Sequence, residues 1–209
     1  MDSKTTKKKP VVKAIALIGI MAALSSILRF LEFPLIFIAP DFLKFDFSNL
    51  PALIVSFVLG PFYGLVVVAI KNLVYLPITQ TAGIGEIADF VLGGIFVVSS
   101  GLIYKLKPTR KTALIGMISG TLIMTAAAAF MNYFFLIPFF ADFFIGAPIT
   151  LKEKIDIIVD AFSRVFPFID SLLKAVVFSV IPFNIIKGVV ISIITFLVYK
   201  KISVIFKKY

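Results

Sequence analysis

The sequence predicts an all-α integral membrane protein, a single domain with six transmembrane helices and both termini in the cytoplasm. Of its 209 residues, 60% are hydrophobic, against about 45–50% in an average soluble domain. A soluble globule of this size could not bury such an excess, so lipid must surround most of the chain. Long apolar runs bounded by charge are the second indication, and the placement of lysine and arginine is the third.

The predicted spans are apolar stretches, and a helix needs about 20 residues to cross the hydrocarbon core. A basic segment at residues 1–12 precedes the six-helix bundle, which is expected over 13–205. Gly60-Pro61 divides one long stretch into two short spans, because proline lacks a backbone donor and disfavours helix in the preceding residue. The expected spans are about 14–30, 48–59, 61–78, 84–105, 112–140 and 171–200.

The segment 141–170, between the fifth and sixth spans, is too polar to cross a membrane. Its apolar residues recur at helical spacing among charged ones, at Ile155, Ile158, Val159 and Phe162. This pattern predicts a short amphipathic helix that lies at the surface or caps the bundle. The loop 34–49 is expected to cap the same, outer side.

Basic residues set the orientation of the spans, because cytoplasmic loops are rich in Lys and Arg. Most of the 21 basic residues fall at 4–13, 105–111 and 200–208. An even number of spans places all three clusters on one side, the cytoplasmic face of the plasma membrane. The net charge of +10 therefore reflects topology and contact with lipid headgroups, not nucleic-acid binding.

Cysteine and histidine are both absent, which excludes disulfides, thiol nucleophiles, Ser-His catalysis and most zinc sites. We therefore expect no catalytic residue, no metal ligand and no cofactor. Glu86 and Asp89 share one helix face, and this pair alone leaves intramembrane proton chemistry open.

Polar residues inside apolar spans indicate a functional site, since a charge at the bilayer centre costs at least about 2.5–3.5 kcal/mol. By topology, these residues converge on the outer half of the bundle, beneath the loop 34–49. An apolar pocket with a few fixed polar groups and an aromatic rim is typical of a small-molecule site. The polar residues are Lys71, Asn72, Glu86, Asp89, Asn132, Asn184 and Lys187, and the expected rim is Phe42, Phe45, Tyr75, Phe135 and Phe168.

Each polar residue also has a purely structural interpretation. Lys71 or Lys187 could pair with an acidic residue of the fourth span inside the bundle. Asn132 could form an interhelical hydrogen bond. The loop residues Asp46, Ser48 and Asn49 could simply cap the second span.

Small residues recur at intervals of three or four along the first span. In lipid, such a stripe marks a helix–helix interface, because small side chains let two backbones approach closely. The interface could lie within this chain or with a partner membrane protein. The residues are Ala16, Gly19, Ala22, Ala23 and Ser26, and Gly116 and Gly120 form a weaker stripe in the fifth span.

Several short runs, taken in order, carry a family resemblance: 44–53 (KFDFSNLPAL), Gly60-Pro61, Lys71-Asn72 and 85–90 (GEIADF). Together they resemble the substrate-binding S components of energy-coupling factor (ECF) vitamin transporters. Asn132-Tyr133-Phe134 and 182–187 (PFNIIK) resemble the riboflavin-specific type. The resemblance covers about residues 11–200.

This resemblance implies a binding subunit that captures riboflavin, as transported ligand and not as cofactor, from outside the cell. Its implied partners are an ECF transmembrane coupling subunit and two ATPase subunits, which would supply the ATP hydrolysis. The chain itself has no Gly-rich phosphate loop. In this family the small-residue stripe docks the coupling subunit, which implies Ala16, Gly19, Ala22 and Ala23 here.

The resemblance also implies which residues bind the vitamin. An asparagine amide offers both a donor and an acceptor to the uracil-like edge of a flavin, so Asn132 and Asn184 are the candidates for that edge. Lys187, one turn from Asn184, could donate to a ring carbonyl or to the ribityl chain. The other expected contacts are Leu43, Asp46, Lys71, Asn72, Tyr75, Gly85, Glu86 and Phe135.

Two other functions stay open. The same scaffold could serve another vitamin, such as pantothenate or a thiamin precursor, although a thiamin-type cation favours acidic and aromatic residues without paired lysines. A small intramembrane enzyme or scaffold is the second alternative, and the absence of any nucleophile–base pair argues against an enzyme.

Overall fold

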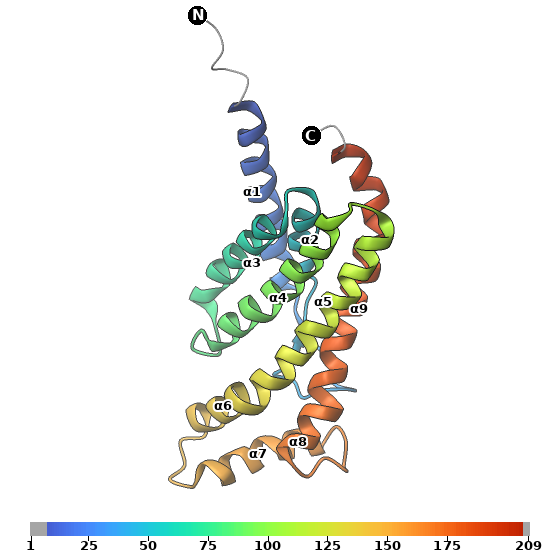
Figure 1. Cartoon of the computed structure of the whole chain (residues 1–209). Helices are drawn as coiled ribbons and strands as arrows, with labels where there is room; N and C mark the ends of the chain where they lie inside the picture. Colours follow the sequence, from blue (N-terminus) through green and yellow to red (C-terminus); the bar gives the residue numbers. More distant parts are fainter. Residues whose placement is uncertain (1–7, 207–209) are drawn as a thin grey trace, which may run out of the picture.

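The computed structural model describes residues 8–206, with side chains over 11–198, and is helical apart from one short strand pair (Figure 1). Residues 1–7 of the predicted basic segment, and Lys207 and Lys208 of the last basic cluster, lie outside the described residues. Five helical runs are long and apolar enough to cross a membrane. They are Val11–Phe30, Pro61–Ile78, Ile84–Leu106, Arg110–Phe144 and Leu172–Val198. The predicted all-α membrane protein is confirmed at this level.

Helix α1 (Lys8–Phe30) leads into a small hairpin. Strand β1 (Phe33–Pro34) pairs antiparallel with β2 (Lys44–Phe45). The predicted capping loop therefore contains a two-residue strand pair. The segment after β2 is bound to α1, because the Ser25 hydroxyl donates to the Ser48 carbonyl oxygen at 2.5 Å.

Helix α2 (Asn49–Val58) matches the span expected at 48–59, but it is only ten residues long. At 1.5 Å per residue it extends about 15 Å, half of the roughly 30 Å hydrocarbon core. Eight of its ten residues are buried. Hydrophobicity at 48–59 therefore reflects burial among other helices rather than a full-length crossing.

The break at Gly60-Pro61 is confirmed. Gly60 has a φ of +119°, a conformation that only glycine adopts easily, and Pro61 begins α3 (Pro61–Tyr75). A 3₁₀ turn, η1 (Leu76–Ile78), follows, and α4 (Ile84–Leu106) begins after a short threonine-containing loop.

The fifth and sixth predicted spans are each interrupted by a π-helical turn. α5 (Arg110–Met131) continues through η2 (Asn132–Leu136) into α6 (Ile137–Phe144), and α8 (Leu172–Ala175) continues through η3 (Val176–Val180) into α9 (Ile181–Phe206). A proline follows each wide turn, at positions 138 and 182. Proline lacks a donor and crowds the carbonyl four residues earlier, which a wider turn accommodates.

Helix α7 (Leu151–Ser163) is the predicted amphipathic helix. Thr150 and Glu153 form a reciprocal capping box at its start, with Glu153 N–H donating to Thr150 Oγ1 at 3.3 Å. Val159 and Phe162 are buried, whereas the polar face is open. α7 packs against α6 at one end of the molecule (Figure 1).

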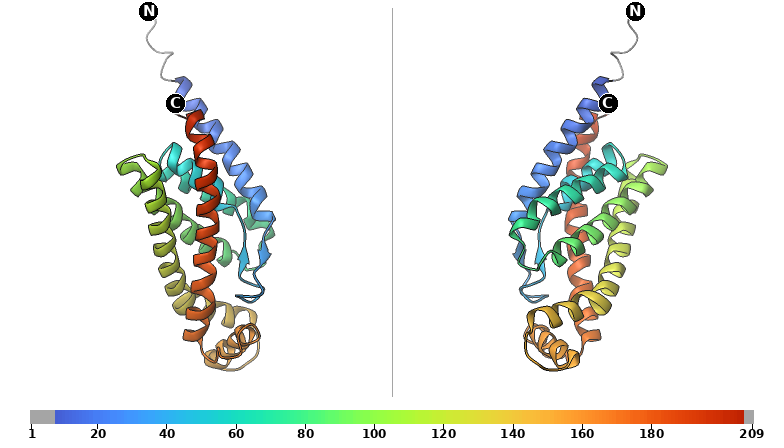
Figure 2. Two further views of the ribbon diagram at one scale, coloured as in Figure 1. Left: turned by 90° about the vertical axis from the view of Figure 1, so that its right-hand side faces the viewer. Right: turned by 90° about the vertical axis from the view of Figure 1, so that its left-hand side faces the viewer.

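The long helices pack side by side, with α4 between α3 and α5, and with α9 along α5 (Figure 2). A β-carbon at Gly116 would lie 2.6 Å from the Ser100 carbonyl oxygen, and one at Gly120 would lie 2.9 Å from that of Phe96. The weaker stripe on α5 is therefore an internal interface with α4. α1 begins and α9 ends at the same end of the molecule, opposite α7 (Figure 1).

Candidate functional site

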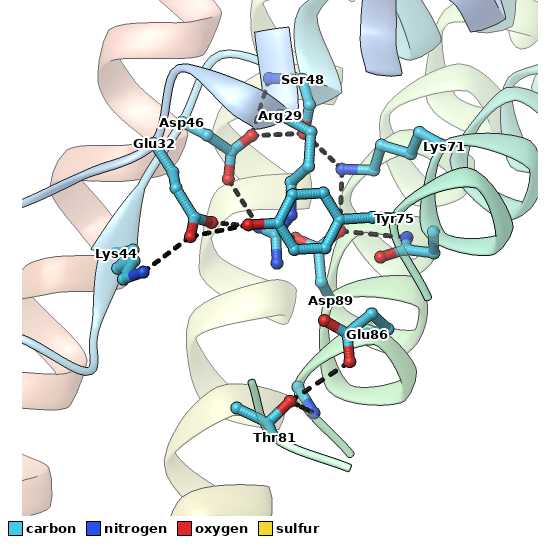
Figure 3. A network of polar contacts seen from close by, with 12 residues as sticks. Arg29, Glu32, Lys44, Asp46, Ser48, Lys71, Tyr75, Thr81, Glu86 and Asp89 are labelled. Atoms are coloured by element: carbon cyan, nitrogen blue, oxygen red, sulfur yellow. Dashed lines mark hydrogen bonds and ion pairs between the residues drawn. The ribbon is translucent and has the colours of Figure 1, made fainter. Parts of the chain in front are cut away.

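Five charged residues from five parts of the chain meet inside the bundle, and Figure 3 labels all of them except the lysine on α9. We call them the ionic cluster: Arg29 on α1, Asp46 before α2, Lys71 on α3, Asp89 on α4 and Lys187 on α9. Asp46 and Lys71 are fully buried, and the side chains of the other three are at most 11% exposed. Charges this deep need partners, because desolvation costs several kcal/mol per ion.

Lys71 and Asp89 form the first pair of the cluster. The Lys71 ammonium lies 2.8 Å from Asp89 Oδ2, and it also donates to Asn49 Oδ1 at 2.8 Å and to Ser48 Oγ at 2.5 Å. Asn72 Nδ2 donates to the same carboxylate oxygen of Asp89 at 3.1 Å. The three donors of the lysine are thus used in full.

Asp46 lies between two cations from opposite ends of the chain. Its Oδ2 accepts from Arg29 Nη1 at 3.0 Å and from Lys187 Nζ at 2.9 Å, while Oδ1 accepts from the Ser48 backbone N–H at 2.7 Å. Burial alone would raise the pKa of Asp46, but the charges of Lys187, Lys71 and Arg29 hold that pKa below its usual range. Asp46 is therefore ionised and joins α1 to α9.

A second layer surrounds Arg29 toward the hairpin (Figure 3). Glu32 accepts from Lys44 Nζ at 2.8 Å and from the Tyr75 hydroxyl at 3.0 Å. The Arg29 guanidinium lies 5.0 Å from the centre of the Tyr75 ring, within the range of a cation–π contact. The β2 strand, α1 and α3 are thereby linked by polar contacts.

The ionic cluster is not neutral: three cations face two carboxylates. Lys44 and Glu32 balance each other, so the excess of one positive charge persists in the wider network. Among the described residues, Arg29 Nε and Asn72 Oδ1 are buried without a hydrogen-bond partner. Arg29 Nε can donate a hydrogen bond and Asn72 Oδ1 can accept one, so these two atoms suit a ligand that has both acceptors and donors.

Of the residues predicted from sequence to bind a ligand, the structure brings five into this network: Asp46, Lys71, Asn72, Tyr75 and Lys187. Pairing of both lysines with an acidic residue of the fourth span is confirmed. Asp89 is that residue, 2.8 Å from Lys71 and 3.6 Å from Lys187.

Glu86 lies apart from the ionic cluster, although it is only three residues from Asp89. It is 5% exposed and accepts from Thr79 Oγ1 at 2.7 Å and from Thr81 Oγ1 at 3.2 Å. Gly85 N–H donates to the same Thr81 hydroxyl at 3.0 Å. Gly85 and Glu86, in the first turn of α4, therefore bind the threonine-containing loop before that helix; Figure 3 shows Glu86 beside Thr81.

Asn132 and Asn184 are both buried, and neither joins the ionic cluster. Each amide nitrogen donates at 2.9 Å to the carbonyl four residues earlier in its own helical run. The interhelical hydrogen bond considered for Asn132 is not formed to any described residue. Each amide keeps one N–H and its oxygen for another partner.

The remaining candidates lie in the loop and on the outside of the bundle. Leu43 is partly buried against two apolar clusters, between the hairpin and the α5–α7 region. Phe135 is 59% exposed and packs against Phe130, with ring centres 5.9 Å apart. Ser48 makes no side-chain cap to α2, so the capping interpretation is wrong for Ser48.

Arg29 and Glu32 are the functional candidates that sequence reasoning missed. Arg29 lies at the end of an apolar span, where a basic residue normally extends to the interface. The sequence did contain one indication of this pair: Arg29 and Glu32 are three residues apart, so they can share a helix face. In the structure Arg29 Nη1 lies 3.8 Å from Glu32 Oε2.

The small-residue stripe of α1 is divided between two faces. Ala22 is 2% exposed and packs in the core, together with Ser26. Ala16, Gly19 and Ala23 face outward, and a β-carbon at Gly19 would meet no described atom within 4 Å. Internal packing therefore explains Ala22 but not the three exposed residues.

Three relatives of similar size match most of the chain. The riboflavin transporter RibU of Staphylococcus aureus is 32% identical over 169 residues, which cover 81% of this chain and 86% of that protein. The riboflavin transporter FmnP of Bacillus subtilis is 32% identical, covering 81% and 90%. The riboflavin transporter RibU of Streptococcus thermophilus is 33% identical, covering 80% and 78%.

A solved structure and a family profile agree with these relatives. The structure, described as the S component of a bacterial ECF transporter, superposes with a TM-score of 0.71 at 30% identity, covering 93% of this chain and 98% of the other. The profile described as "ECF transporter, substrate-specific component" matches residues 13–199. The chain therefore belongs to the family of substrate-specific S components of ECF transporters.

Proposed function

We propose that this chain is the riboflavin-binding subunit of an ECF-type importer. One observation carries the proposal: three relatives named riboflavin transporters are each 32–33% identical over about four fifths of the chain. The chain captures riboflavin from outside the cell, and its partners use ATP to deliver the vitamin inward. It acts as a binding subunit, not as an enzyme.

The membrane topology belongs to the proposal. In the proposed topology the five long helical runs cross the membrane, and the half-length α2, buried among them, returns the chain as a sixth pass. Six passes place both termini on the cytoplasmic side of the plasma membrane. The ionic cluster and the α4 loop then lie toward the outside, where the vitamin arrives.

The amides of Asn132 and Asn184 support a flavin as ligand. Each has a donor and an acceptor left over after its own backbone contact, and the uracil-like edge of a flavin presents an N–H between two carbonyls. Asn184 and Lys187 share one face of α9. Lys187 has three donors, of which Asp46 uses one at 2.9 Å, so it can reach a ring carbonyl while keeping that pair.

The ribityl chain fits the polar residues nearer the hairpin. Its hydroxyls both donate and accept, so they can bind the Asp46 and Glu86 carboxylates as well as Asn72 and Tyr75. Lys71, whose three donors are already used, contributes its positive charge. We place Leu43 and Phe135 against the apolar part of the ring system and Gly85 at a backbone contact. The excess positive charge of the ionic cluster favours such an acceptor-rich ligand over a cationic one.

Assembly with partners uses the outer face of α1. Ala16, Gly19 and Ala23 are exposed small residues on one side of a membrane helix, which permit close approach of another helix. We propose that they dock the transmembrane coupling subunit, which in turn carries two ATPase subunits. Ala22 is assigned to the core instead.

A fluorescence titration tests the proposal. The purified protein in detergent should quench free riboflavin fluorescence in a saturable manner, and a preparation from riboflavin-fed cells should be yellow. Pantothenate and thiamin in excess should not reverse the quenching, because neither has the tricyclic ring. A colourless protein that leaves riboflavin fluorescence unchanged contradicts the assignment.

A further inference from the structure

We propose that a groove between α5 and α9 binds an acyl chain of an anionic phospholipid, with the phosphate held by Arg110. The groove has a volume of about 290 Å³. Its walls are almost wholly apolar, and they include Leu114, Ile118 and Leu122 of α5 and Val189, Ile193 and Phe196 of α9. The proposal does not depend on which vitamin the chain binds.

The length of the groove matches one leaflet. On α9 it extends from Ile185 to Leu197, which corresponds to about 18 Å of helix. One leaflet contributes about half of the roughly 30 Å hydrocarbon core. Within the crossing runs Arg110–Phe144 and Leu172–Val198, the lining residues all lie in the half that contains Arg110 or Val198, so the groove opens into a single leaflet.

Arg110 marks the polar end of this groove. It is the first residue of α5, and its guanidinium carbon lies 5.3 Å from the centre of the Phe196 ring, which lines the groove. The side chain is exposed, and it forms no ion pair with any described residue. The guanidinium therefore lies at the polar end of the apolar groove. A phospholipid has the same arrangement, with its phosphate at one end and its acyl chain extending from it.

The local charge favours an anion at Arg110. The sequence has no Asp or Glu from Phe90 to Ala141, and none after Asp170. Neither wall of the groove can therefore supply a competing carboxylate, whereas Lys107 and Lys111 add positive charge beside Arg110. A phosphate is a favoured partner for a planar guanidinium, because it accepts two parallel hydrogen bonds.

Ser192 supplies a second polar feature, one turn deeper than Phe196. It lines the groove, is 9% exposed, and has a buried hydroxyl without a hydrogen-bond partner among the described residues. One turn of helix is about 5–6 Å, the depth at which the ester carbonyl of a phospholipid lies below its phosphate. Rotation of the Ser192 side chain about its Cα–Cβ bond would turn this unpaired hydroxyl toward an ester carbonyl in the groove.

The shape of the walls favours an acyl chain over a partner helix. Helices that associate in lipid present small residues to each other, but the exposed rims of this groove carry branched and aromatic side chains, such as Ile118, Ile193 and Leu197. The glycine near this groove, Gly188 on α9, instead permits close contact with α5 of the same chain, since a β-carbon there would lie 2.5 Å from Thr121.

Native mass spectrometry of the purified full chain tests the site, with phosphatidylglycerol and phosphatidylcholine of the same acyl chains as probes. The wild-type protein should retain phosphatidylglycerol in preference to phosphatidylcholine. Arg110→Gln should weaken phosphatidylglycerol retention by about tenfold or more, because a charge-assisted hydrogen bond is lost. Ile193→Trp should fill the groove and reduce retention of both lipids.

Two matched variants separate this site from general lipid contact. Lys111→Gln removes the same charge at the next position, and Ile123→Trp enlarges an exposed isoleucine of α5 outside the groove. Ile123→Trp should behave like the wild type, and Lys111→Gln should weaken phosphatidylglycerol retention much less than Arg110→Gln does. Equal retention of the two lipids by the wild type overturns the proposal, as does an effect of Lys111→Gln equal to that of Arg110→Gln. If Ile193→Trp does not fold, the comparison of Arg110→Gln with Lys111→Gln still tests the proposal.

Discussion

At the scale of residues, the imbalance of charge in the ionic cluster makes each of its carboxylates structurally important. Asp89 is within 4 Å of three cations, the closest being Lys71 at 2.8 Å. Buried ion pairs contribute little net stability when complete, but removal of one partner leaves an uncompensated charge. The cluster should therefore tolerate the loss of a carboxylate far less than a surface pair would.

Asp89→Asn should lower the free energy of unfolding by about 3–5 kcal/mol, since three cations would then face Asp46 alone. The measurement is thermal unfolding of the purified protein in detergent. Asp142→Asn is the matched control, because Asp142 pairs with Lys154 at the same 2.8 Å but its side chain is 72% exposed. Equal melting temperatures for the two variants would contradict a structural role for the buried charge.

Asn184→Ala should weaken riboflavin binding by about 1–3 kcal/mol, because a buried edge of the ligand would lose its partner. Fluorescence quenching measures the affinity. The unfolding temperature without riboflavin should stay close to that of the wild type, since Asn184 bonds only to its own helix in the described chain. Unchanged affinity would remove Asn184 from the site.

Sequence alone could predict that Lys71 and Lys187 find acidic partners, because charges in apolar spans are rarely left unpaired. It could not choose between Glu86 and Asp89, which are three residues apart on one face. The choice depends on the loop before α4, where Thr79 and Thr81 engage Glu86. That loop geometry is a tertiary feature with no periodic signal in the sequence.

At the scale of elements, apolar runs and the Gly60-Pro61 break predicted the helices well, because hydropathy and proline act locally. The half-length of α2 was not predictable in this way. Its residues are as apolar as those of a crossing helix, but they face other helices instead of lipid. The wide turns at Asn132–Leu136 and Val176–Val180 likewise depend on how each helix adjusts around a proline.

The contact between α4 and α5 gives a sharp test of packing. Gly120→Leu should destabilise the fold by about 1–3 kcal/mol or more, since even its β-carbon would lie 2.9 Å from the Phe96 carbonyl oxygen. Gly146→Leu is the control, because a β-carbon there meets no described atom within 4 Å. Thermal unfolding of both variants measures the difference, and similar stabilities would argue against tight contact at Gly120.

At the scale of the whole molecule, α1 connects the two proposed activities. Its inner face carries Ser25 and Arg29 into the polar interior, while its outer face carries Gly19 and Ala23. Arg29 and Gly19 are ten residues apart, about 15 Å along the helix. One helix therefore contributes both to the ligand region, through its inner face, and to the surface proposed to bind the coupling subunit, through its outer face.

Gly19→Leu should block assembly with the coupling subunit while leaving riboflavin binding intact. The added side chain points into open space in the isolated chain, so it does not disturb the fold, but it prevents close approach of another helix. Co-purification with the coupling subunit and fluorescence quenching measure the two effects separately. Ala126→Leu, which enlarges an exposed alanine on α5, should affect neither. A complex formed by Gly19→Leu at the wild-type yield would exclude this face of α1 as the docking surface, because a leucine at its centre keeps two helix backbones apart.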